Sequence, residues 1–303
     1  MKKNNESSEG NGQSSHKEAL FLDQKLRPEA WADYVGQTHI KQNLEILLSA
    51  AKERAHPPEH LLFYGPPGLG KTTLAHLIAK ETSAQMKITS GPAIEKVGII
   101  IGKGPSARTI QLELPPFTLI AATTRIALLS APLRSRFSGG VFRLEFYTEE
   151  EIEEIVTRSS KILGVPLEKG AGKEISTRSR FTPRTANYFL KRARDFAQVN
   201  KTGLDVHAVK EALRLLEIDE IGLNQPDRHM LTVLIEKFGG RPVGLGTIAA
   251  ATSEEEATIE EVYEPYLLKL GLLERTPRGR IPTKKAYEHL GFDYPKDAQE
   301  KLL

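Results

Sequence analysis

The residues best suited to chemistry in this chain of 303 residues form the glycine-rich segment Gly65–Thr73. Its pattern, G-x-x-x-x-G-K-T, places backbone N–H groups around phosphate oxygens at the N-terminus of a helix. Lys71 would reach the outer phosphates, and the Thr72 hydroxyl would help to hold Mg²⁺. A glycine-rich turn could match this motif by chance, but an apolar run at His60–Tyr64 precedes it and an apolar-periodic segment follows from Leu74. The order strand, phosphate loop, helix therefore predicts a site for a nucleoside triphosphate.

Composition narrows the class of protein. The chain is 39% hydrophobic and 27% charged, which is ordinary for a globular protein of two or three domains. It contains no cysteine, so it has neither disulfides nor thiolate metal sites, and this fits a reducing cytoplasm. There is no apolar run of membrane-spanning length and no secretory signal. A net charge of +3 means that any nucleic-acid footprint must be local.

The segments around the loop alternate between strand and helix patterns, which predicts an α/β domain. A helix is expected ahead of the loop, where the apolar residues with helical spacing are Ile40, Leu44, Leu47 and Leu48. Further elements are expected in order along the chain: a second strand at Met86–Thr89, a β-hairpin at Ile99–Leu114, a buried strand at Phe117–Thr124, a short helix at Leu128–Phe137 and a last strand at Val141–Tyr147.

After Tyr147 the apolar spacing is helical. Thr148 and Glu151 form a capping box, and Thr182-Pro183 and Asp205 begin two more helices of a small helical domain. From Asp227 onward the spacing predicts three helices followed by a hairpin, the order of a winged helix.

The C-terminal hairpin, Leu272–Ile281, is strongly basic. Arg275, Arg278 and Arg280 lie within six positions around its turn, where they suit contact with the phosphates of a DNA duplex. The alternative is a solvated charged turn, but the position of the hairpin after three helices favours DNA binding.

Taken together, these residues resemble one family, the RuvB motors that drive branch migration of Holliday junctions in bacteria and are AAA+ ATPases. The phosphate loop alone would indicate only an NTPase, whereas the matching segments keep the family's order from about residue 25 to about residue 292. The resemblance rests on Arg27-Pro28, Tyr34–Gln37, Gly65–Thr73, Thr89–Pro92, Ile101–Arg108, Leu114–Ile120, Ala122–Arg125, Leu144–Tyr147 and Arg275–Arg280.

The resemblance implies roles for individual residues. Thr123 or Thr124 would be sensor 1, and Arg136 would be an arginine finger that completes the site of a neighbouring subunit. Arg184, at a helix start, would be sensor 2. The implied catalytic residues are Lys71, Thr124, Arg136 and Arg184, with Thr72 on the metal. The implied nucleotide site comprises Leu26, Arg27, Gly65, Gly68, Gly70, Lys71, Thr72, Thr73, Arg136, Tyr147 and Arg184.

The resemblance also implies cofactors and partners. These are ATP with Mg²⁺, Holliday-junction or other double-stranded DNA, RuvA, RuvC and other copies of the chain in a hexameric ring, all in the cytoplasm and away from membranes. The hairpin bearing Ile110 and Leu112 would dock on RuvA through exposed apolar side chains. Taken singly, each residue has a plainer explanation: a surface ion pair for an arginine, a strand end for a threonine, and the core for Ile110 and Leu112.

One departure from the family concerns catalysis directly. Relatives carry a helix, a strand ending in Asp-Glu and another helix where this chain passes straight from Gly98 to Ile99, so about 30 or more residues are missing. Without those carboxylates Mg²⁺ lacks an orienting partner and water lacks its base. Without that strand Met86–Thr89 lacks a neighbour. The resulting hypothesis is that the chain binds nucleotide weakly and hydrolyses it poorly or not at all.

Two smaller departures concern turns. Ser138-Gly139-Gly140 is one residue longer than the family's turn, and Phe181 stands where a glycine is usual, which predicts a strained turn.

The sequence therefore predicts an α/β AAA+ domain whose parallel sheet lacks one strand, a small helical lid and a C-terminal winged helix. The expected boundaries are a disordered tail at 1–19, the large ATPase domain at 20–147, the lid at 148–220 and the winged helix at 221–303. The leading function is an ATP-driven motor subunit for branch migration in DNA recombination and repair. The alternatives are a catalytically impaired subunit that still binds DNA or RuvA, and another AAA+ machine such as a clamp-loader subunit.

Overall fold

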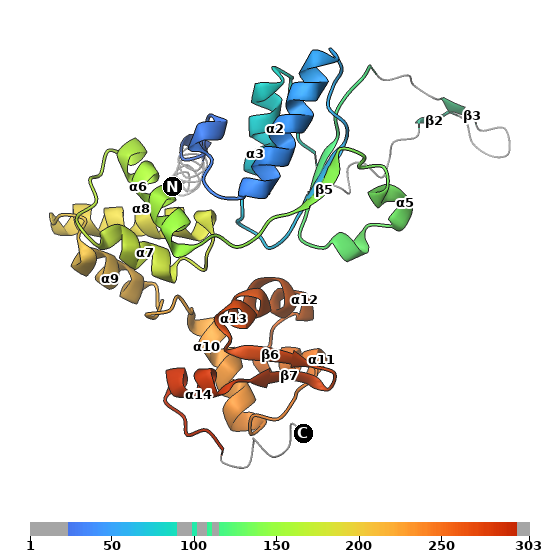
Figure 1. The fold of residues 1–303 in the computed structure, drawn as a ribbon. Helices are drawn as coiled ribbons and strands as arrows, with labels where there is room; N and C mark the ends of the chain where they lie inside the picture. Colours follow the sequence, from blue (N-terminus) through green and yellow to red (C-terminus); the bar gives the residue numbers. More distant parts are fainter. Residues whose placement is uncertain (1–23, 90–98, 102–107, 111–114, 296–303) are drawn as a thin grey trace, which may run out of the picture. The chain divides into compact units, whose positions relative to one another are not determined.

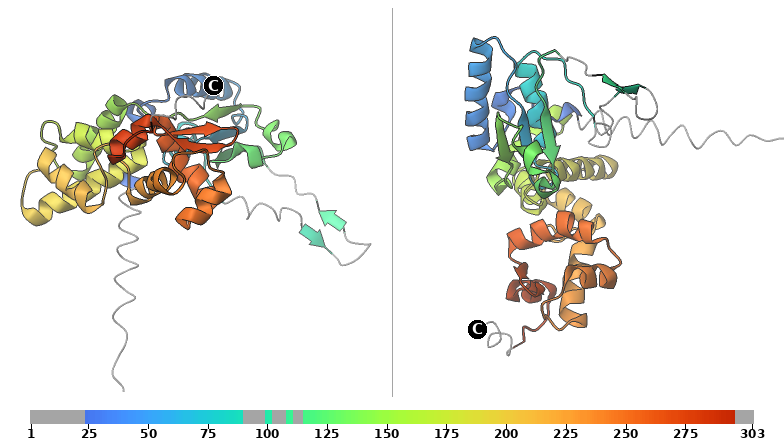
Figure 2. Two further views of the ribbon diagram at one scale, coloured as in Figure 1. Left: turned by 90° about the horizontal axis from the view of Figure 1, so that it is seen from below. Right: turned by 90° about the vertical axis from the view of Figure 1, so that its right-hand side faces the viewer.

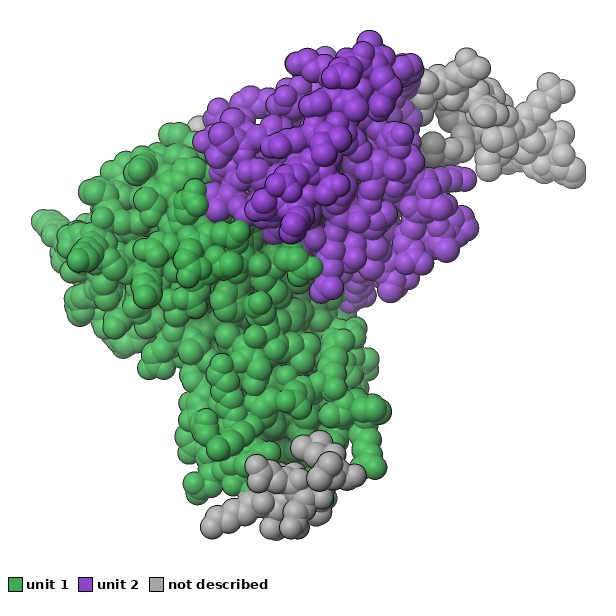
Figure 3. Space-filling view, in the orientation of Figure 1, with its two compact units in different colours: residues 1–27, 65–69, 145–303 green, residues 28–64, 70–144 purple. Residues whose placement is uncertain are grey.

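A computed structural model describes residues 24–89, 99–101, 108–110 and 115–295 (Figure 1). The chain separates into two compact units, coloured differently in Figure 3. One comprises residues 28–64 and 70–144, and the other comprises residues 1–27, 65–69 and 145–303. The expected tail at 1–19 lies outside the described residues.

The unit built from residues 28–64 and 70–144 contains a small parallel sheet with its helices. Its elements are η1 (Trp31–Asp33), α2 (Thr38–Glu53), β1 (Leu61–Tyr64), α3 (Lys71–Glu81), β2 (Ile99–Ile101), β3 (Arg108–Ile110), β4 (Ile120–Thr123), η2 (Ile126–Leu128), α5 (Ala131–Arg134) and β5 (Gly140–Arg143).

The sheet has three strands in the order β4-β1-β5, and both pairings are parallel. Tyr64, the last residue of β1, is level with Thr123 of β4 and Arg143 of β5. The carboxyl ends of the strands therefore share one edge, and the phosphate loop leaves β1 at that edge. The central position of β1 explains its apolar sequence, because Leu61, Leu62 and Phe63 are fully buried.

Two strand predictions need correction. Met86–Thr89 is not a strand, and its apolar side chains are exposed (Ile88 is 70% exposed). A strand needs a hydrogen-bonding neighbour, and the described part of the sheet offers none for this segment. Phe117–Thr124 contains β4, but this strand is not buried: Ala122 is exposed and Phe117 is 52% exposed. Among the described residues β4 pairs only with β1, so its other edge has no strand beside it.

The short hairpin β2–β3 is antiparallel, with Ile99 opposite Ile110. The predicted hairpin is thus confirmed for its first and middle residues, whereas Leu112 lies outside the described residues.

The second unit begins with the predicted helical domain, made of α6 (Glu149–Leu163), α7 (Ala171–Arg178), α8 (Pro183–Asn200) and α9 (Val206–Leu215). The predicted capping box of α6 is present, because Thr148 and Glu151 exchange side-chain and backbone hydrogen bonds at 2.9 and 3.2 Å. Asp205 caps α9 by accepting from the Ala208 N–H at 2.7 Å. Thr182 stands at the N-cap of α8 as predicted, but its hydroxyl bonds to Thr185 and to the Ser179 carbonyl instead of capping a backbone N–H.

The remaining residues form the predicted three helices and hairpin (Figure 2, orange to red). Their elements are α10 (Gln225–Thr232), η3 (Val233–Lys237), α11 (Leu245–Thr252), α12 (Glu256–Thr258), η4 (Ile259–Tyr263), α13 (Glu264–Leu270), β6 (Leu273–Thr276), β7 (Gly279–Pro282) and α14 (Lys284–Leu290). These elements enclose a core of their own, which includes Leu231, Leu234, Ile248, Ile259 and Leu267. The fold class predicted from the sequence is therefore confirmed. Within the described residues, no helix combines the length and apolarity that crossing a membrane requires.

Candidate nucleotide site and basic hairpin

The phosphate loop has the backbone conformation that its glycines permit. Gly65, Gly68 and Gly70 have φ angles of +134°, +83° and +96°, a region that other residues rarely enter. Helix α3 starts at Lys71, and no side chain caps its N-terminus. The N-terminus of a helix of this length attracts an anion, which the predicted phosphate site requires.

Gly68 also lies against the start of α8. A Cβ atom added at Gly68 would lie 3.3 Å from the Cβ of Arg184 and 3.4 Å from the Cβ of Thr182. No side chain larger than hydrogen fits there without displacing these residues. The exposed Arg184 therefore stands directly beside the loop, as its expected role at the phosphates requires.

Tyr147 is the second residue of the helical unit that contacts the loop. It is 3% exposed, and its hydroxyl donates to the Leu69 carbonyl at 3.2 Å. Its backbone N–H donates to the Phe181 carbonyl at 3.1 Å. One buried side chain thus links the phosphate loop to the turn that precedes α8.

A cleft of about 330 Å³ opens where the loop, the start of α8 and the C-terminal helices meet. A volume of this order is typical of small-molecule sites. Its lining includes Pro66, Gly68, Thr182, Arg184, Asn224 and Pro265.

The structure places the other predicted site residues as follows. Thr124 follows β4 at the sheet edge where the loop begins, and Arg136 is exposed just after α5. Leu26 is buried, and its carbonyl accepts from Arg158 Nη2 at 2.8 Å, which holds it against α6. Gly68, Tyr147 and Arg184 come together within one unit. Lys71, Thr72, Thr73, Thr124 and Arg136 belong to the other unit.

Ligands for a metal ion are few. Thr72 is exposed in the first turn of α3, as a metal-binding hydroxyl must be. Among the described residues, however, no group of three or more His, Asp or Glu side chains could hold a cation. The residues that end β4 are threonines. The parts of the chain that the structure describes thus offer Mg²⁺ a hydroxyl at the loop but no group of carboxylates.

The basic hairpin is built around a buried acid that sequence reasoning missed. Glu264, the first residue of α13, is fully buried and accepts from Arg275 Nε at 2.7 Å and Arg280 Nε at 2.5 Å. Arg275 and Arg280 lie directly opposite each other on β6 and β7, where two like charges would repel. Glu264 therefore holds both guanidinium groups in place. Arg278 is exposed at the turn.

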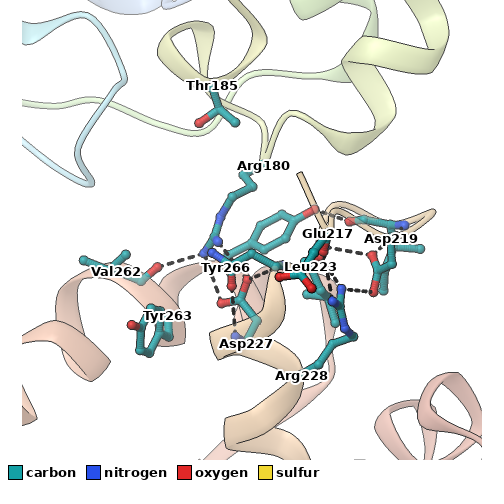
Figure 4. Close-up of polar contacts among 12 residues, drawn as sticks. Arg180, Thr185, Glu217, Asp219, Leu223, Asp227, Arg228, Val262, Tyr263 and Tyr266 are labelled. Atoms are coloured by element: carbon teal, nitrogen blue, oxygen red, sulfur yellow. Dashed lines mark hydrogen bonds and ion pairs between the residues drawn. The ribbon is translucent and has the colours of Figure 1, made fainter. Parts of the chain in front are cut away.

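A second buried ion pair joins the turn before α8 to the C-terminal helices (Figure 4). Arg180 donates to Asp227 Oδ2 at 2.8 Å and to the Val262 carbonyl at 2.9 Å, and its guanidinium stacks over the Tyr266 ring at 4.6 Å. The Asp227 side chain is fully buried. Burial raises the pKa of Asp227 above its ordinary value, and the Arg180 charge acts in the opposite direction.

The predicted strain in this turn is present. Phe181, for which the sequence predicted strain, has a φ angle of +53°, and Arg180 before it has a φ angle of +57°. Neither residue is glycine, so both conformations are unfavourable and persist only because the surroundings impose them. The Phe181 ring packs edge-on against Phe146 and tilted against Tyr266, at 6.4 and 5.9 Å between centroids.

The phosphate loop, the helical domain and the winged helix together define the class of P-loop NTPases that carry a helical lid and a C-terminal winged helix. Three family models match this order: the Holliday junction DNA helicase RuvB P-loop domain at residues 26–99 and 96–144, the RuvB AAA lid domain at 147–219, and the RuvB C-terminal winged helix domain at 220–291. The chain is similar to the Holliday junction branch migration complex subunit RuvB of Dehalococcoides mccartyi, at 49% identity over 91% of both chains.

Solved structures of RuvB superpose on this chain. The Thermotoga maritima RuvB Holliday junction branch migration motor superposes with a TM-score of 0.81 at 40% identity, covering 89% of this chain and all of that one. A mutant of the same protein superposes with a TM-score of 0.80 at 39% identity, covering 89% of this chain and 99% of that one. The chain belongs to the RuvB family.

The comparisons also bear on the missing strand. The P-loop domain model matches in two segments, 26–99 and 96–144, which overlap at the point between Gly98 and Ile99 where the sequence indicates a missing segment. The alignment with the Dehalococcoides protein spans 320 positions, whereas 91% of this chain is about 276 residues, so about 44 positions have no counterpart here.

Proposed function

We propose that this chain is a nucleotide-binding and junction-binding subunit of a branch-migration motor, acting on Holliday junctions with RuvA and RuvC in a hexameric ring. ATP would be its nucleotide and Mg²⁺ its metal ion. The observation that carries the proposal is the phosphate loop, with Tyr147 bonded to it and Arg184 beside it in the same unit as a winged helix.

The residues of the proposed nucleotide site would have different roles, which follow from the chemistry of their side chains. The loop N–H groups and Lys71 would bind the phosphates, and Thr72 would contribute its hydroxyl to the metal ion. Arg184 would sense the outer phosphate from the lid, and Thr124 would do so from the end of β4. Arg136 is exposed and so is free to reach a neighbouring subunit, which the arginine-finger role requires.

DNA would be held by the basic hairpin. Arg275 and Arg280, which are oriented by Glu264, and the exposed Arg278 would contact backbone phosphates. Such contacts carry little sequence information, and binding through them weakens steeply with salt.

A second candidate function is a subunit that binds but does not hydrolyse. The observation that favours it is that no strand among the described residues ends in an Asp-Glu pair, so that water lacks a positioned base. A clamp-loader subunit is not proposed, because the winged helix matches the RuvB family.

The experiment is steady-state ATP turnover by the purified protein with Mg²⁺, RuvA and a four-way junction. General-base catalysis contributes about 10²–10⁴-fold, so we expect turnover at least about 100-fold below that of a relative with the Asp-Glu pair. Lys71→Ala should abolish nucleotide binding, whereas Lys80→Ala should not, because Lys80 is exposed on the same helix and makes only a surface ion pair. Turnover equal to that of a relative with the Asp-Glu pair would refute the expectation of slow hydrolysis. Nucleotide binding that survives Lys71→Ala would refute the assignment of the phosphate loop as the nucleotide site.

A further inference from the structure

Residues 179–184, which join α7 to α8 and include the first two residues of α8, contact the phosphate loop on one side and the winged helix on the other. We propose that Arg180 is the positioning residue that couples these two sides, so that nucleotide at the loop and duplex at the hairpin alter each other's affinity through the Arg180–Asp227 pair. This inference rests on the proposed function, because it requires that the chain bind both ligands.

The contacts on the loop side are made by Thr182, Arg184 and Tyr147. Thr182 and Arg184 lie within 3.3–3.5 Å of the place where a Cβ on Gly68 would be. Tyr147 donates from its hydroxyl to the Leu69 carbonyl and from its backbone to the Phe181 carbonyl. A change in the loop on binding phosphate therefore meets the 179–184 turn directly.

The contacts on the winged-helix side involve two separate helical segments, α10 and the continuous segment formed by η4 and α13. Arg180 bonds to Asp227 in the first turn of α10, to the carbonyl of Val262 in η4, and stacks on Tyr266 of α13 (Figure 4). The Arg180 side chain is 15% exposed and that of Asp227 is not exposed at all. Separating such a buried pair would leave an unpaired charge in the interior, so the turn and both helices move together.

Of these elements, α13 leads directly into the basic hairpin. Glu264 begins α13, which also carries Tyr266, and Glu264 holds Arg275 and Arg280. A displacement of α13 by Arg180 would therefore reorient the arginines that face DNA.

The linker between α9 and α10, residues 216–224, is also held by hydrogen bonds. Arg228 donates to the carbonyls of Leu223 and Glu217 at 2.7 and 2.9 Å, and lies 3.6 Å from Asp219. The linker therefore cannot absorb the motion of the turn by bending freely.

The backbone conformation of this turn also supports the proposed coupling. Arg180 and Phe181 both adopt positive φ angles without being glycine. A turn held in an unfavourable conformation by contacts on both sides has an alternative conformation available when one set of contacts changes.

The test is a thermodynamic cycle, since linkage requires that nucleotide change duplex affinity by the same factor by which duplex changes nucleotide affinity. Affinity for a fluorescent duplex is measured at fixed salt with and without a saturating non-hydrolysable ATP analogue and Mg²⁺. Affinity for a fluorescent derivative of the same ATP analogue, with Mg²⁺, is measured with and without saturating duplex. The coupling ratio is the affinity for one ligand in the presence of the other, divided by its affinity alone. We expect this ratio to differ from unity by about 5-fold or more in the unmodified protein.

Arg180→Gln should bring that ratio to within about 2-fold of unity while each separate affinity changes by less than about 3-fold. Arg214→Gln is the matched control, because Arg214 is exposed on the same helical domain and pairs only with Glu211; it should keep the full ratio. If Arg180→Gln does not fold, as judged by circular dichroism, Asp227→Asn removes the charge with little change of shape and takes its place.

The outcomes separate the two proposals. Failure of the unmodified protein to bind nucleotide or duplex alone overturns the proposed function. Binding of both ligands with a ratio near unity, or an unchanged ratio in Arg180→Gln, overturns this inference only.

Discussion

Replacing Gly68 by alanine tests the geometry of the phosphate loop directly. The φ angle of Gly68 is +83°, and the left-handed region costs a non-glycine residue about 1–2 kcal/mol. The new methyl group would also lie 3.3 Å from the Cβ of Arg184, which is closer than most carbon contacts, and 3.4 Å from the Cβ of Thr182. The free loop can relax away from this strain, whereas a loop that wraps phosphate cannot.

The strain therefore acts mainly on binding. A penalty of 1–2 kcal/mol corresponds to about 5- to 30-fold weaker binding of nucleotide, and crowding of Arg184 adds to it. The assay is equilibrium titration with a fluorescent ATP analogue and Mg²⁺, together with urea unfolding to report stability.

Gly164→Ala is the matched control. Gly164 ends α6 with a φ angle of +69°, and nothing lies within 4 Å of the position where its Cβ would be. This variant should lose about 1–2 kcal/mol of stability and bind nucleotide normally. Normal nucleotide affinity in Gly68→Ala, or equal loss of affinity in both variants, would refute the reasoning.

The remaining predictions concern the hairpin and the junction. Arg278→Ala should reduce the slope of log affinity for duplex against log salt by about one and leave stability unchanged, because Arg278 is exposed at the turn. Arg280→Ala should instead lower the free energy of unfolding by about 1.5–3 kcal/mol, since it removes a charged hydrogen bond from the buried Glu264. Urea titration measures the stability of both variants, and equal stability of Arg278→Ala and Arg280→Ala would contradict the role of Glu264. The raised pKa of Asp227 means that the folded state holds this proton more tightly than the unfolded state does, so its contribution to stability is present below the ordinary value near 3.8 and is lost as pH rises through the raised value. The difference in unfolding free energy between the unmodified protein and Asp227→Asn should therefore fall as pH rises from about 4, and a pH-independent difference would contradict it.

Local patterns accounted for much of the fold. The capping box of Thr148 and Glu151, the cap at Asp205 and the basic hairpin all join residues close in sequence, so spacing alone predicts them. The prediction of a second strand was wrong for a non-local reason. Met86–Thr89 has a strand's composition, but in the part of the chain that the structure describes it has no neighbouring strand to pair with.

The sequence also identified the loop of the nucleotide site but not the contacts around it. Tyr147 and Arg184 were expected there only by family resemblance, because they are separated from Gly68 by many residues. Their contacts with the loop appear only in the folded chain.

By itself, the sequence determined the family, the phosphate loop, the order of lid and winged helix, and the absence of the Asp-Glu strand. These follow from residue types at short, regular spacings. The tertiary structure alone decided that Arg180 pairs with Asp227, which is 47 positions away, and that Glu264 holds two arginines of the hairpin. A charged side chain looks like a solvated surface group in the sequence, and only its burial against a distant partner shows that it joins one element to another.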